Sequence, residues 1–438
     1  PSETHANVAL QTILDTGSCS SVGADALLYA IQTIPSTDNA FVSCVKQVVE
    51  GAKITPPSKD TPMSSSDVIG RLHVSMFSSQ WKQRSPESIE AASGSELFPG
   101  SVDAAIERLS DVKLHLDHTI VGWQSTGLYL NPGEVLKLQV IDGDVQGWNI
   151  QIGCHTDTLW HKQSWQRWPE ITHNSPIKQD MNMATPWGGL VYFLAGQTES
   201  DITISLSGVI EAPFFDVEHT DLDWFKVRMY SSPWAELKGK HMIITVPSDA
   251  VRMLDNPLEV TTFWDEVMLS HCDLAGIPVP KRLERFVADQ QISAGYMHSG
   301  YPVMTWLDVA TPENGKLAPV VDVDKLKKQG SWGHFHELGH NLQKSTWTFA
   351  GTGEVTCNLF SLHAGEVLCG IEPWENPWLT GQFESGKKYL ASDANFDIWK
   401  RKPGVALISY AHLQRAFGWE PVTTVFRIYK PMDVPERP

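Results

Sequence analysis

One short motif constrains this chain more than any other feature of its sequence. Residues 336–340 read His-Glu-Leu-Gly-His, and Glu354 follows fourteen positions after the second histidine. On a helix, His336 and His340 project from one face, so both imidazoles can reach a single metal ion. Glu337, between them, then stands beside the water that such an ion binds and is placed to act as a general base. The motif therefore predicts a helix over 333–343 that carries a metal site.

Glu354 is the predicted third ligand, because a second helix over 353–368 begins with it and can converge on the same ion. Three protein ligands leave one position open for water, which is the catalytic arrangement of Zn²⁺. One bound Zn²⁺ is therefore expected. Two alternatives stay open. Glu354 could serve only as a carboxylate favoured at a helix N-terminus, or Glu366, twelve residues further along, could be the third ligand.

Three neighbours of these residues have expected roles of their own. Asn358, four residues after Glu354, is placed to orient that ligand, although a position on the helix surface is an equal alternative. His334 lies on a different face of its helix from His336 and is expected to be structural. Cys357 is expected in the core rather than on the metal.

The segment 291–302 interleaves glycines with tyrosine and histidine, as expected where a substrate backbone approaches closely. An exposed strand edge here would pair with an extended peptide. His298 and Tyr301 are then candidates for stabilising the oxyanion. Taken alone, the segment is equally a glycine-rich turn between strands. The residues assigned to substrate binding are Gly295, Tyr296, Gly300 and Trp347.

The rest of the chain divides by pattern into three parts and predicts an α+β multidomain fold. Residues 1–100 are expected to be a partly helical N-terminal region and linker, with helical spacing over 24–31 and mostly connector from Pro56 to Gly100. Within that connector, 68–77 suits a strand or a short helix. Residues 101–232 alternate short strands with turns, which predicts a β-sandwich of the galactose-binding-like kind.

Residues 233–438 predict a mainly helical domain with a small sheet. Strands are expected over 241–246 and 285–292. Asn256-Pro257-Leu258-Glu259 supplies a cap, a proline at the first helical position and a glutamate at the third, so a helix should run from there to about 274. A further helix over 405–417 should end at Gly418.

The length, composition and net charge of the chain indicate its size class and exclude some kinds of binding partner. The 438 residues suffice for two or three domains, and 42% hydrophobic with 19% charged residues describe an ordinary soluble globular protein. A net charge of −17 argues against nucleic acid and anionic membrane surfaces. No apolar stretch is long enough to span a bilayer and the N-terminus lacks a signal-peptide pattern, so no membrane insertion is expected. The protein is expected to be a monomer.

Cysteine and tryptophan leave alternatives open. The six cysteines contain no Cys-x-x-Cys pair, so they predict no second zinc site. Their even number permits disulfides, with Cys19–Cys44 the nearest pair in sequence, or equally six free thiols. Most of the 17 tryptophans are expected in the core. If the β-sandwich is instead a carbohydrate-binding domain, Trp160, Trp165 and Trp168 are the candidate platform for sugar rings.

Six segments together resemble one known family, and they occur in the same order. The segments are Ser125–Glu134, Ile152–Asp157, Pro186–Phe193, Gln291–Met304, His336–Gln343 and Gly351–Leu362. They resemble the enhancin-like M60 peptidases, including bacterial secreted mucin-degrading enzymes, and the M60-like domain of the vertebrate TRPM8 channel-associated factors. The resemblance extends from about residue 97 to 430.

The resemblance implies a gluzincin-type catalytic domain preceded by a β-sandwich. His336, His340 and Glu354 match the family's metal ligands, and Glu337 matches its catalytic glutamate. The bacterial members imply cleavage of the peptide backbone beside Ser or Thr that carries an O-linked glycan.

Two hypotheses follow. The first is a zinc metalloendopeptidase that acts on O-glycosylated, mucin-like proteins and is secreted or held at the cell surface. The second is an interaction module of the channel-associated-factor kind, cytoplasmic, with a structural or vestigial metal site. Cys154 and Cys357 lie in motifs that those intracellular proteins share, which favours free thiols and the second hypothesis. The complete set of ligands and base favours the first, because a purely structural site has no need of Glu337.

Overall fold

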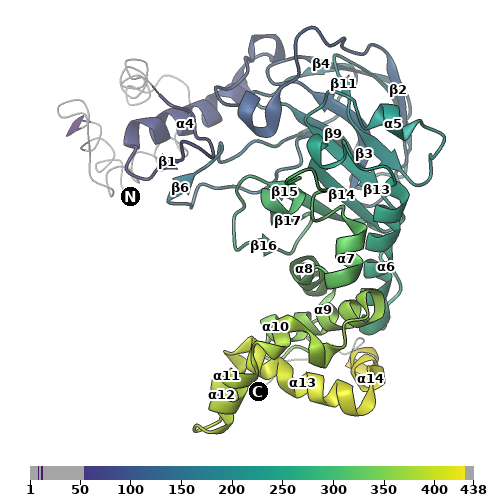
Figure 1. The fold of residues 1–438 in the computed structure, drawn as a ribbon. Helices are drawn as coiled ribbons and strands as arrows, with labels where there is room; N and C mark the ends of the chain where they lie inside the picture. The colour runs from purple at the N-terminus through teal and green to yellow at the C-terminus, as the bar shows by residue number, and fades with distance from the viewer. Residues whose placement is uncertain (1–7, 9–10, 13–53, 430–438) are drawn as a thin grey trace. The chain divides into compact units, whose positions relative to one another are not determined.

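The computed structural model describes residues 8, 11–12 and 54–429 (Figure 1). The expected helix over 24–31 and the pair Cys19–Cys44 lie outside the described residues. The described chain forms two compact units. The first comprises residues up to Ala212 with 230–234 and 289–293, and the second comprises 213–229, 235–288 and residues from Ala294 onward. The division into 1–100, 101–232 and 233–438 stays a prediction.

Two antiparallel sheets form the β-sandwich that the alternating pattern predicts (Figure 1). Their inner faces share a core in which Trp148, Ile150 and Phe193 are at most 1% exposed. The first sheet has the order β2 (Val112–Leu116), β10 (Ile202–Ser207), β4 (Leu136–Asp142), β8 (Met181–Met183). The second has the order β11 (Ile210–Glu211), β3 (Trp123–Leu130), β9 (Gly189–Ala195), β5 (Trp148–Ile152), β7 (His173–Pro176).

The stretch from Pro56 to Gly100 is packed rather than a connector. Its segment 68–77 belongs to α4 (Val68–Gln80), whose N-terminus is capped by the Asp67 side chain. Strand β1 (Met63–Ser64) pairs with β6 (Ser164–Trp165). The rings of Phe77 and Trp81 lie edge-on to that of Trp187, with centroids 6.1 and 5.4 Å away. These aromatic contacts hold the stretch against the sandwich. The Ser- and Pro-rich composition of the stretch gave no sign of this packing.

A six-stranded sheet positions the predicted site in the second unit. Its strands β14 and β15 are parallel and are joined by α6 (Pro257–Ala275), while β16 pairs antiparallel with β17 and ends the sheet. The predicted strand over 285–292 ends earlier, at Asp289. The order is β12 (Phe214–Asp216), β13 (Trp234–Lys238), β14 (Met242–Pro247), β15 (Glu284–Asp289), β17 (Val303–Trp306), β16 (Met297–His298).

Helices make up most of the remainder, and the two with strong end signals begin and end close to where the sequence predicts. In α6 the Asn256 side chain accepts from the Glu259 N–H, and Gly276 ends the helix in the left-handed conformation. Helix α13 (Pro403–Phe417) ends at Gly418. The other helices are α5 (Trp224–Val227), α7 (Val323–Gln329), α8 (Trp332–Leu342), α9 (Gly353–Cys369), α10 (Pro377–Thr380), α11 (Phe383–Leu390), α12 (Phe396–Lys400) and α14 (Glu420–Tyr429).

Two negative findings concern the described residues alone. No helix there is both long and apolar enough to span a bilayer. The four cysteines described there, Cys154, Cys272, Cys357 and Cys369, form no disulfide.

Candidate metal centre

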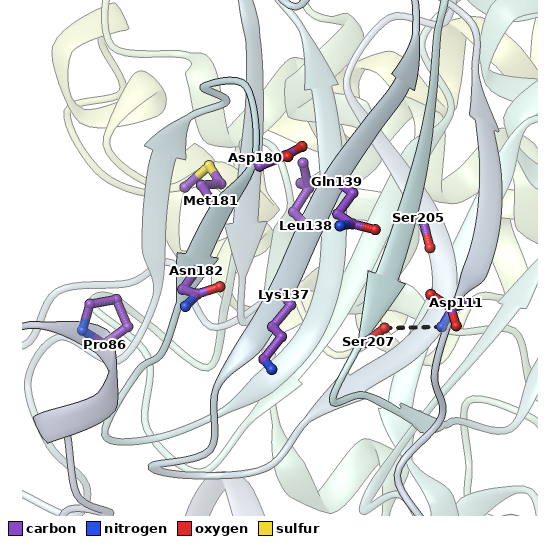
Figure 2. A pocket seen from close by; sticks show the side chains of 10 residues that line it. All are labelled: Pro86, Asp111, Lys137, Leu138, Gln139, Asp180, Met181, Asn182, Ser205 and Ser207. Carbon is purple, nitrogen blue, oxygen red and sulfur yellow. Dashed lines mark hydrogen bonds between the residues drawn. The ribbon is translucent and has the colours of Figure 1, made fainter.

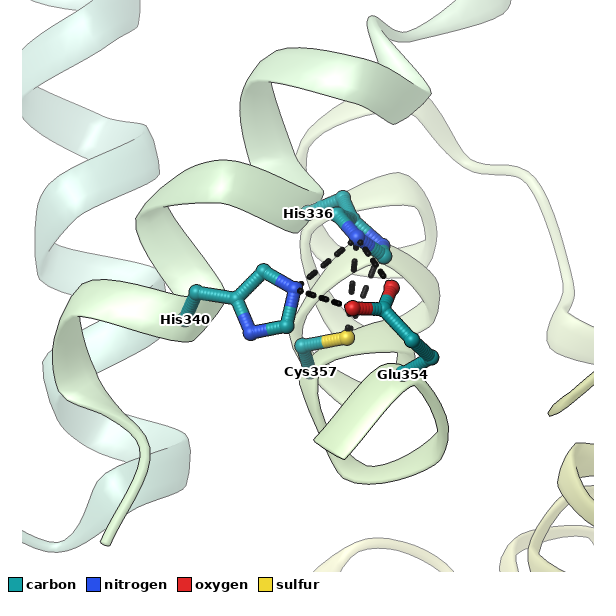
Figure 3. A group of neighbouring side chains, drawn as sticks. All are labelled: His336, His340, Glu354 and Cys357. Atoms are coloured by element: carbon teal, nitrogen blue, oxygen red, sulfur yellow. Dashed lines mark hydrogen bonds and ion pairs between the residues drawn. The ribbon is translucent and has the colours of Figure 1, made fainter. Parts of the chain in front are cut away.

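Helices α8 and α9 bring the three predicted ligands together (Figure 3). The Nε2 atoms of His336 and His340 are 3.1 Å apart. One carboxylate oxygen of Glu354 lies 3.2 Å from His336 Nε2, and the other lies 3.4 Å from His340 Nε2. The helical spacing of the histidines and the position of Glu354 in the first turn of α9 therefore produce one compact group of donor atoms.

The spacing of these donor atoms fits Zn²⁺. Ligands about 2.05 Å from a tetrahedral centre are about 3.3 Å from one another. The two Nε2 atoms are 3.1 Å apart, and each lies 3.2 or 3.4 Å from a different oxygen of Glu354, which is close to this value. Two neutral imidazoles and one carboxylate also form a donor set that this ion accepts. The three residues can thus hold zinc with one coordination position left for another molecule.

Close packing of the two helices depends on Gly339. A Cβ atom at this position would lie 2.7 Å from the Cys357 carbonyl oxygen, so a larger residue would push α8 away from α9. The contact brings Asn358 beside the first histidine, where its Oδ1 atom lies 2.7 Å from His336 Nδ1. The Nδ2 group of Asn358 donates to the Glu354 carbonyl at 2.7 Å. The structure therefore places Asn358 against His336 rather than on the surface of its helix.

Gln343 is a residue of the site that the sequence analysis missed. Its Oε1 atom lies 3.1 Å from His340 Nδ1, and its Nε2 group donates to the Gly353 carbonyl at 2.8 Å and to the Thr356 hydroxyl. The signal in the sequence was its place three residues after His340, which is the first position after α8.

Burial and charge shift the ionisation of the central carboxylates in opposite directions. Burial raises the pKa of Glu337, although His336 and His340 oppose the shift, and the residue is 8% exposed. Contacts with the two histidines hold the pKa of Glu354 well below its ordinary value. Burial alone would lower the pKa of His340, but its contacts with Glu354 and Gln343 raise it. A carboxyl group of raised pKa beside the ligands can both take up and release a proton.

Cys357 packs against a predicted ligand, and its Sγ atom lies within 4.8 Å of the donor atoms of His336, His340 and Glu354. Its Sγ atom is 3.5 Å from Nδ1 and 3.8 Å from Nε2 of His336, so it lies alongside the imidazole ring (Figure 3). The residue is fully buried, and burial raises the pKa of its thiol. Its expected place in the core is what the structure shows.

The glycine-rich segment lies at the edge of the sheet beside α8. The amide of Asn341, the residue after His340, accepts from the Gly300 N–H and donates to the Gly300 carbonyl, both at 2.9 Å. Gly333 allows the approach, because a Cβ there would lie 2.7 Å from Met297 Sδ. The edge strand β16 and the helix of the predicted ligands are therefore joined by direct contacts.

The two oxyanion candidates lie in this region, and their roles stay predictions. His298 is close enough to Glu337 to lower the pKa of that carboxyl, and its Nδ1 atom lies 2.9 Å from the Ser299 carbonyl oxygen. The Arg282 guanidinium lies over the ring of Tyr301, 4.3 Å from its centroid. Both side chains are half-buried, so each can be reached by a ligand.

The residues assigned to substrate binding differ in exposure. The Tyr296 side chain is exposed, and its hydroxyl donates to Asp308 at 2.5 Å. The Gly295 carbonyl accepts from Trp306 Nε1 at 3.1 Å. Trp347 is 6% exposed and stacks on Phe426 with centroids 4.4 Å apart. The role of Trp347 in substrate binding stays a prediction, and the burial of its side chain does not favour that role.

The positions of Glu366 and His334 show that neither belongs to the group of predicted ligands. The Glu366 carboxylate accepts from Trp419 Nε1 at 2.5 Å and from Gln414 at 3.1 Å, and it does not belong to the group of donor atoms. It is therefore wrong as a rival third ligand. His334 is buried beside Ser331, with Nδ1 2.7 Å from the hydroxyl, and burial lowers its pKa to about 3. Its expected structural role agrees with this.

The predicted tryptophan platform on the β-sandwich is wrong. Trp165 and Trp168 are 0% and 3% exposed, and the half-buried Trp160 meets Trp165 edge-on, so the three rings do not form an exposed platform. A hollow of about 560 Å³ lies on the same domain, and none of its ten lining residues is aromatic (Figure 2). In the part of the chain described, one other group of metal-binding side chains occurs, and there His118 Nδ1 lies 2.5 Å from the Asp201 carboxylate, an exposed ion pair.

The contact of Asn341 with Gly300 gives a first prediction. For the peptide cleavage that the sequence motifs predict, replacing Asn341 with alanine should lower kcat/KM by about 10- to 100-fold while zinc stays bound, because the edge strand loses its alignment with α8. The measurement is steady-state kinetics together with zinc content. Asn182→Ala, which removes an exposed amide bonded to Glu87 on the β-sandwich, is the matched control. Equal kinetics in the two variants would contradict the alignment role.

The fold and the group of predicted ligands are those of a metallopeptidase-type domain. The family described as Peptidase M60, enhancin and enhancin-like matches residues 208–438, and the N-terminal domain of M60-like peptidases matches 107–207. The chain belongs to the M60 peptidase family, as its sequence motifs predict.

Two curated relatives illustrate the likeness in sequence. A TRPM8 channel-associated factor homolog from Danio rerio is 38% identical over 320 residues, which cover 71% of this chain and 34% of the relative. TRPM8 channel-associated factor 2 from Homo sapiens is 35% identical over 322 residues, covering 70% and 34%. The chain thus spans about a third of the length of these relatives.

Solved structures agree in fold. A conserved protein from Bacillus anthracis superposes with a TM-score of 0.57 at 22% identity, covering 74% of this chain and 68% of that one. The IMPa metallopeptidase from Pseudomonas aeruginosa superposes with a TM-score of 0.52 at 15% identity, covering 94% and 53%. At these identities the likeness shows the fold alone.

Proposed function

We propose that this chain is a zinc metalloendopeptidase that cleaves the backbone of O-glycosylated, mucin-like proteins. The observation that carries the proposal is the group of His336, His340 and Glu354, with donor atoms 3.1 to 3.4 Å apart. Glu337 lies on the same helix, buried and with a raised pKa. Ligands alone would serve a structural ion, whereas the added carboxyl group supplies the base that hydrolysis needs.

Each residue has a role in the proposed reaction. When bound, zinc polarises the scissile carbonyl group. Glu337 takes a proton from the attacking water and then passes it to the leaving amine. His298 or Tyr301 stabilises the negative charge that develops on the carbonyl oxygen. The substrate backbone lies along β16, the edge strand beside α8, and adds to the sheet as a further strand.

The class of substrate has support from a structural neighbour. IMPa from Pseudomonas aeruginosa, in a structure with an O-glycopeptide, superposes with a TM-score of 0.51 at 16% identity. This identity supports a shared fold, and the glycosylated substrate is proposed for this chain by analogy. A protein that acts on mucin-like substrates meets them outside the cell or at its surface, which is the proposed location.

A second candidate function is favoured by the curated relatives. They are named for association with the TRPM8 channel and are 33% to 38% identical over most of this chain. On that proposal the domain is a cytoplasmic interaction module, for which the absence of a disulfide at Cys154 and Cys357 is suitable. The module has no use for a buried carboxyl group of raised pKa beside three ligands, so we favour the peptidase.

Comparison of two forms of one substrate separates these proposals. The zinc-loaded chain should cleave an O-glycosylated mucin peptide, and enzymatic removal of its glycans should lower the rate by at least about tenfold, since sugar contacts contribute binding energy in the transition state. Products are measured by mass spectrometry. Equal cleavage of both forms would contradict the glycan requirement but retain the peptidase. Absence of turnover for either form at full zinc occupancy would favour the interaction module.

A further inference from the structure

We infer that Gln343 is a positioning residue, which fixes the tautomer of His340 and links that histidine to the helix of Glu354. The inference rests on the proposed zinc site. Gln343 is the first residue after α8, where its backbone N–H donates to the Gly339 carbonyl at 2.9 Å. That bond completes the end of the helix, so the side chain is not needed as a cap and can turn back toward the ligands.

The orientation of the amide follows from its partners. One end of the Gln343 side chain lies 2.8 Å from the Gly353 carbonyl oxygen, which can only accept a hydrogen bond. This end must therefore be the NH₂ group, which leaves Oε1 facing His340 Nδ1 at 3.1 Å. An amide oxygen can only accept, so His340 Nδ1 must carry the proton. The lone pair of His340 then resides on Nε2, the atom that faces His336 and Glu354.

The same reasoning applies to the first histidine. Asn358 Nδ2 donates to the Glu354 carbonyl, so its Oδ1 faces His336 Nδ1 and accepts the proton there. Both histidines thus present Nε2 to the predicted ion. In each case the partner is a neutral amide rather than a carboxylate. Neutral partners set the tautomer without adding negative charge to a site that already contains Glu354 and Glu337.

Gln343 also joins the two helices that supply the ligands. Its Nε2 group bonds to the carbonyl of Gly353 and the hydroxyl of Thr356, residues on either side of Glu354 in the first turn of α9. One side chain therefore contacts a histidine of α8 and the turn that carries the carboxylate. Its loss should affect both the tautomer of His340 and the separation of the two helices.

Two substitutions and one control separate these effects. Gln343→Met keeps the length of the side chain and removes both hydrogen-bonding ends. Gln343→Glu keeps an acceptor for His340 but loses the donor to α9. Thr356→Val removes one of the two hydrogen bonds from Gln343 to α9 and leaves its contacts with Gly353 and His340 in place. Zinc affinity of the full chain is measured by competition with a chromophoric chelator, and ¹⁵N NMR of the zinc-free chain reports the tautomer of His340.

Gln343→Met should weaken zinc binding by about 10- to 100-fold and should produce a mixture of His340 tautomers. Gln343→Glu should recover most of the affinity, and Thr356→Val should stay within about threefold of the wild type. Unchanged zinc affinity and tautomer in Gln343→Met would overturn the inference. Equal losses in Gln343→Met and Thr356→Val would overturn the tautomer role and leave only a link between helices.

The outcome is separable from that of the proposed function. A wild-type chain that binds zinc and cleaves no peptide would contradict the peptidase proposal, while the effect of Gln343→Met on affinity would still stand. A wild-type chain that binds no zinc would overturn both. If Gln343→Met does not fold, the tautomer of His340 in Gln343→Glu becomes the test of the inference. A proton on His340 Nε2 in that variant would contradict the inference.

Discussion

Replacing Glu337 with glutamine should lower peptide cleavage by about 10²- to 10⁴-fold, the usual contribution of a general base. Zinc should remain bound, because Glu337 is not one of the three predicted ligands. Glutamine has nearly the shape of glutamate but cannot accept and release a proton, so the loss will report on chemistry rather than on packing. The measurement is the rate of cleavage of a defined glycopeptide, together with zinc content of the variant.

A matched control is Glu384→Gln on α11, where the carboxylate is exposed and pairs only with Lys387. This variant should cleave at the wild-type rate. Cleavage by Glu337→Gln at the wild-type rate would contradict the proposed mechanism. Loss of zinc from that variant would instead show that Glu337 is needed for binding, and its role as a base would then require a different test.

Removal of Asp289 should have the largest effect on stability, a loss of about 3–5 kcal/mol. Arg167 donates to both carboxylate oxygens of Asp289, at 2.8 and 2.7 Å, and the two side chains are 1% and 0% exposed. In Asp289→Ala the guanidinium would stay buried without a counter-charge, which is costly in a medium of low dielectric constant. Urea unfolding followed by tryptophan fluorescence measures the free energy of unfolding.

A second Arg–Asp pair provides the control. Asp255 pairs with Arg228 at 2.6 Å, but its side chain is 75% exposed, so Asp255→Ala should cost at most about 1 kcal/mol. The double variant Arg167→Met with Asp289→Leu removes both charges and should recover much of the lost stability. A loss below about 1 kcal/mol in Asp289→Ala would show that the buried guanidinium is compensated in another way.

The ligand set could be predicted from the sequence because it depends on helical periodicity. A spacing of four positions between His336 and His340 fixes a shared helical face whatever the surrounding fold, and the placement of Glu354 follows from a second helix with a clear start. Gln343 and Asn341 could not be predicted in the same way. Their contacts depend on how the chain leaves α8 and on which strand ends the sheet, and both are set by tertiary packing.

The fold shows the same division between local and non-local signals. Helix α6 was predictable because its cap, proline and terminal glycine lie in the helix itself. The strands of the sandwich were predictable from their alternation. A strand edge or a turn was predicted within 291–302, but the bounds of β16 and β17 were not, since β16 has only two residues and too little sequence for a period. The stretch from Pro56 to Gly100 was wrongly predicted as a connector because Ser- and Pro-rich segments are typical of connectors. In the structure this stretch is packed, with the side chains of Leu72 and Trp81 buried.

The contact between Asn341 and Gly300 has a consequence for where a peptide would be cut. One side-chain amide gives the Gly300 N–H and carbonyl the two hydrogen bonds that an adjacent strand would give them. Gly300 lies in the turn that follows β16, so the helix that holds the predicted ligands also holds the end of this edge strand in place. Each residue of a peptide that adds to β16 would then lie at a defined distance from the predicted metal site. Since a shift by one residue reverses every side chain, a glycan on such a peptide would always project from the same face at the same distance from the cut bond.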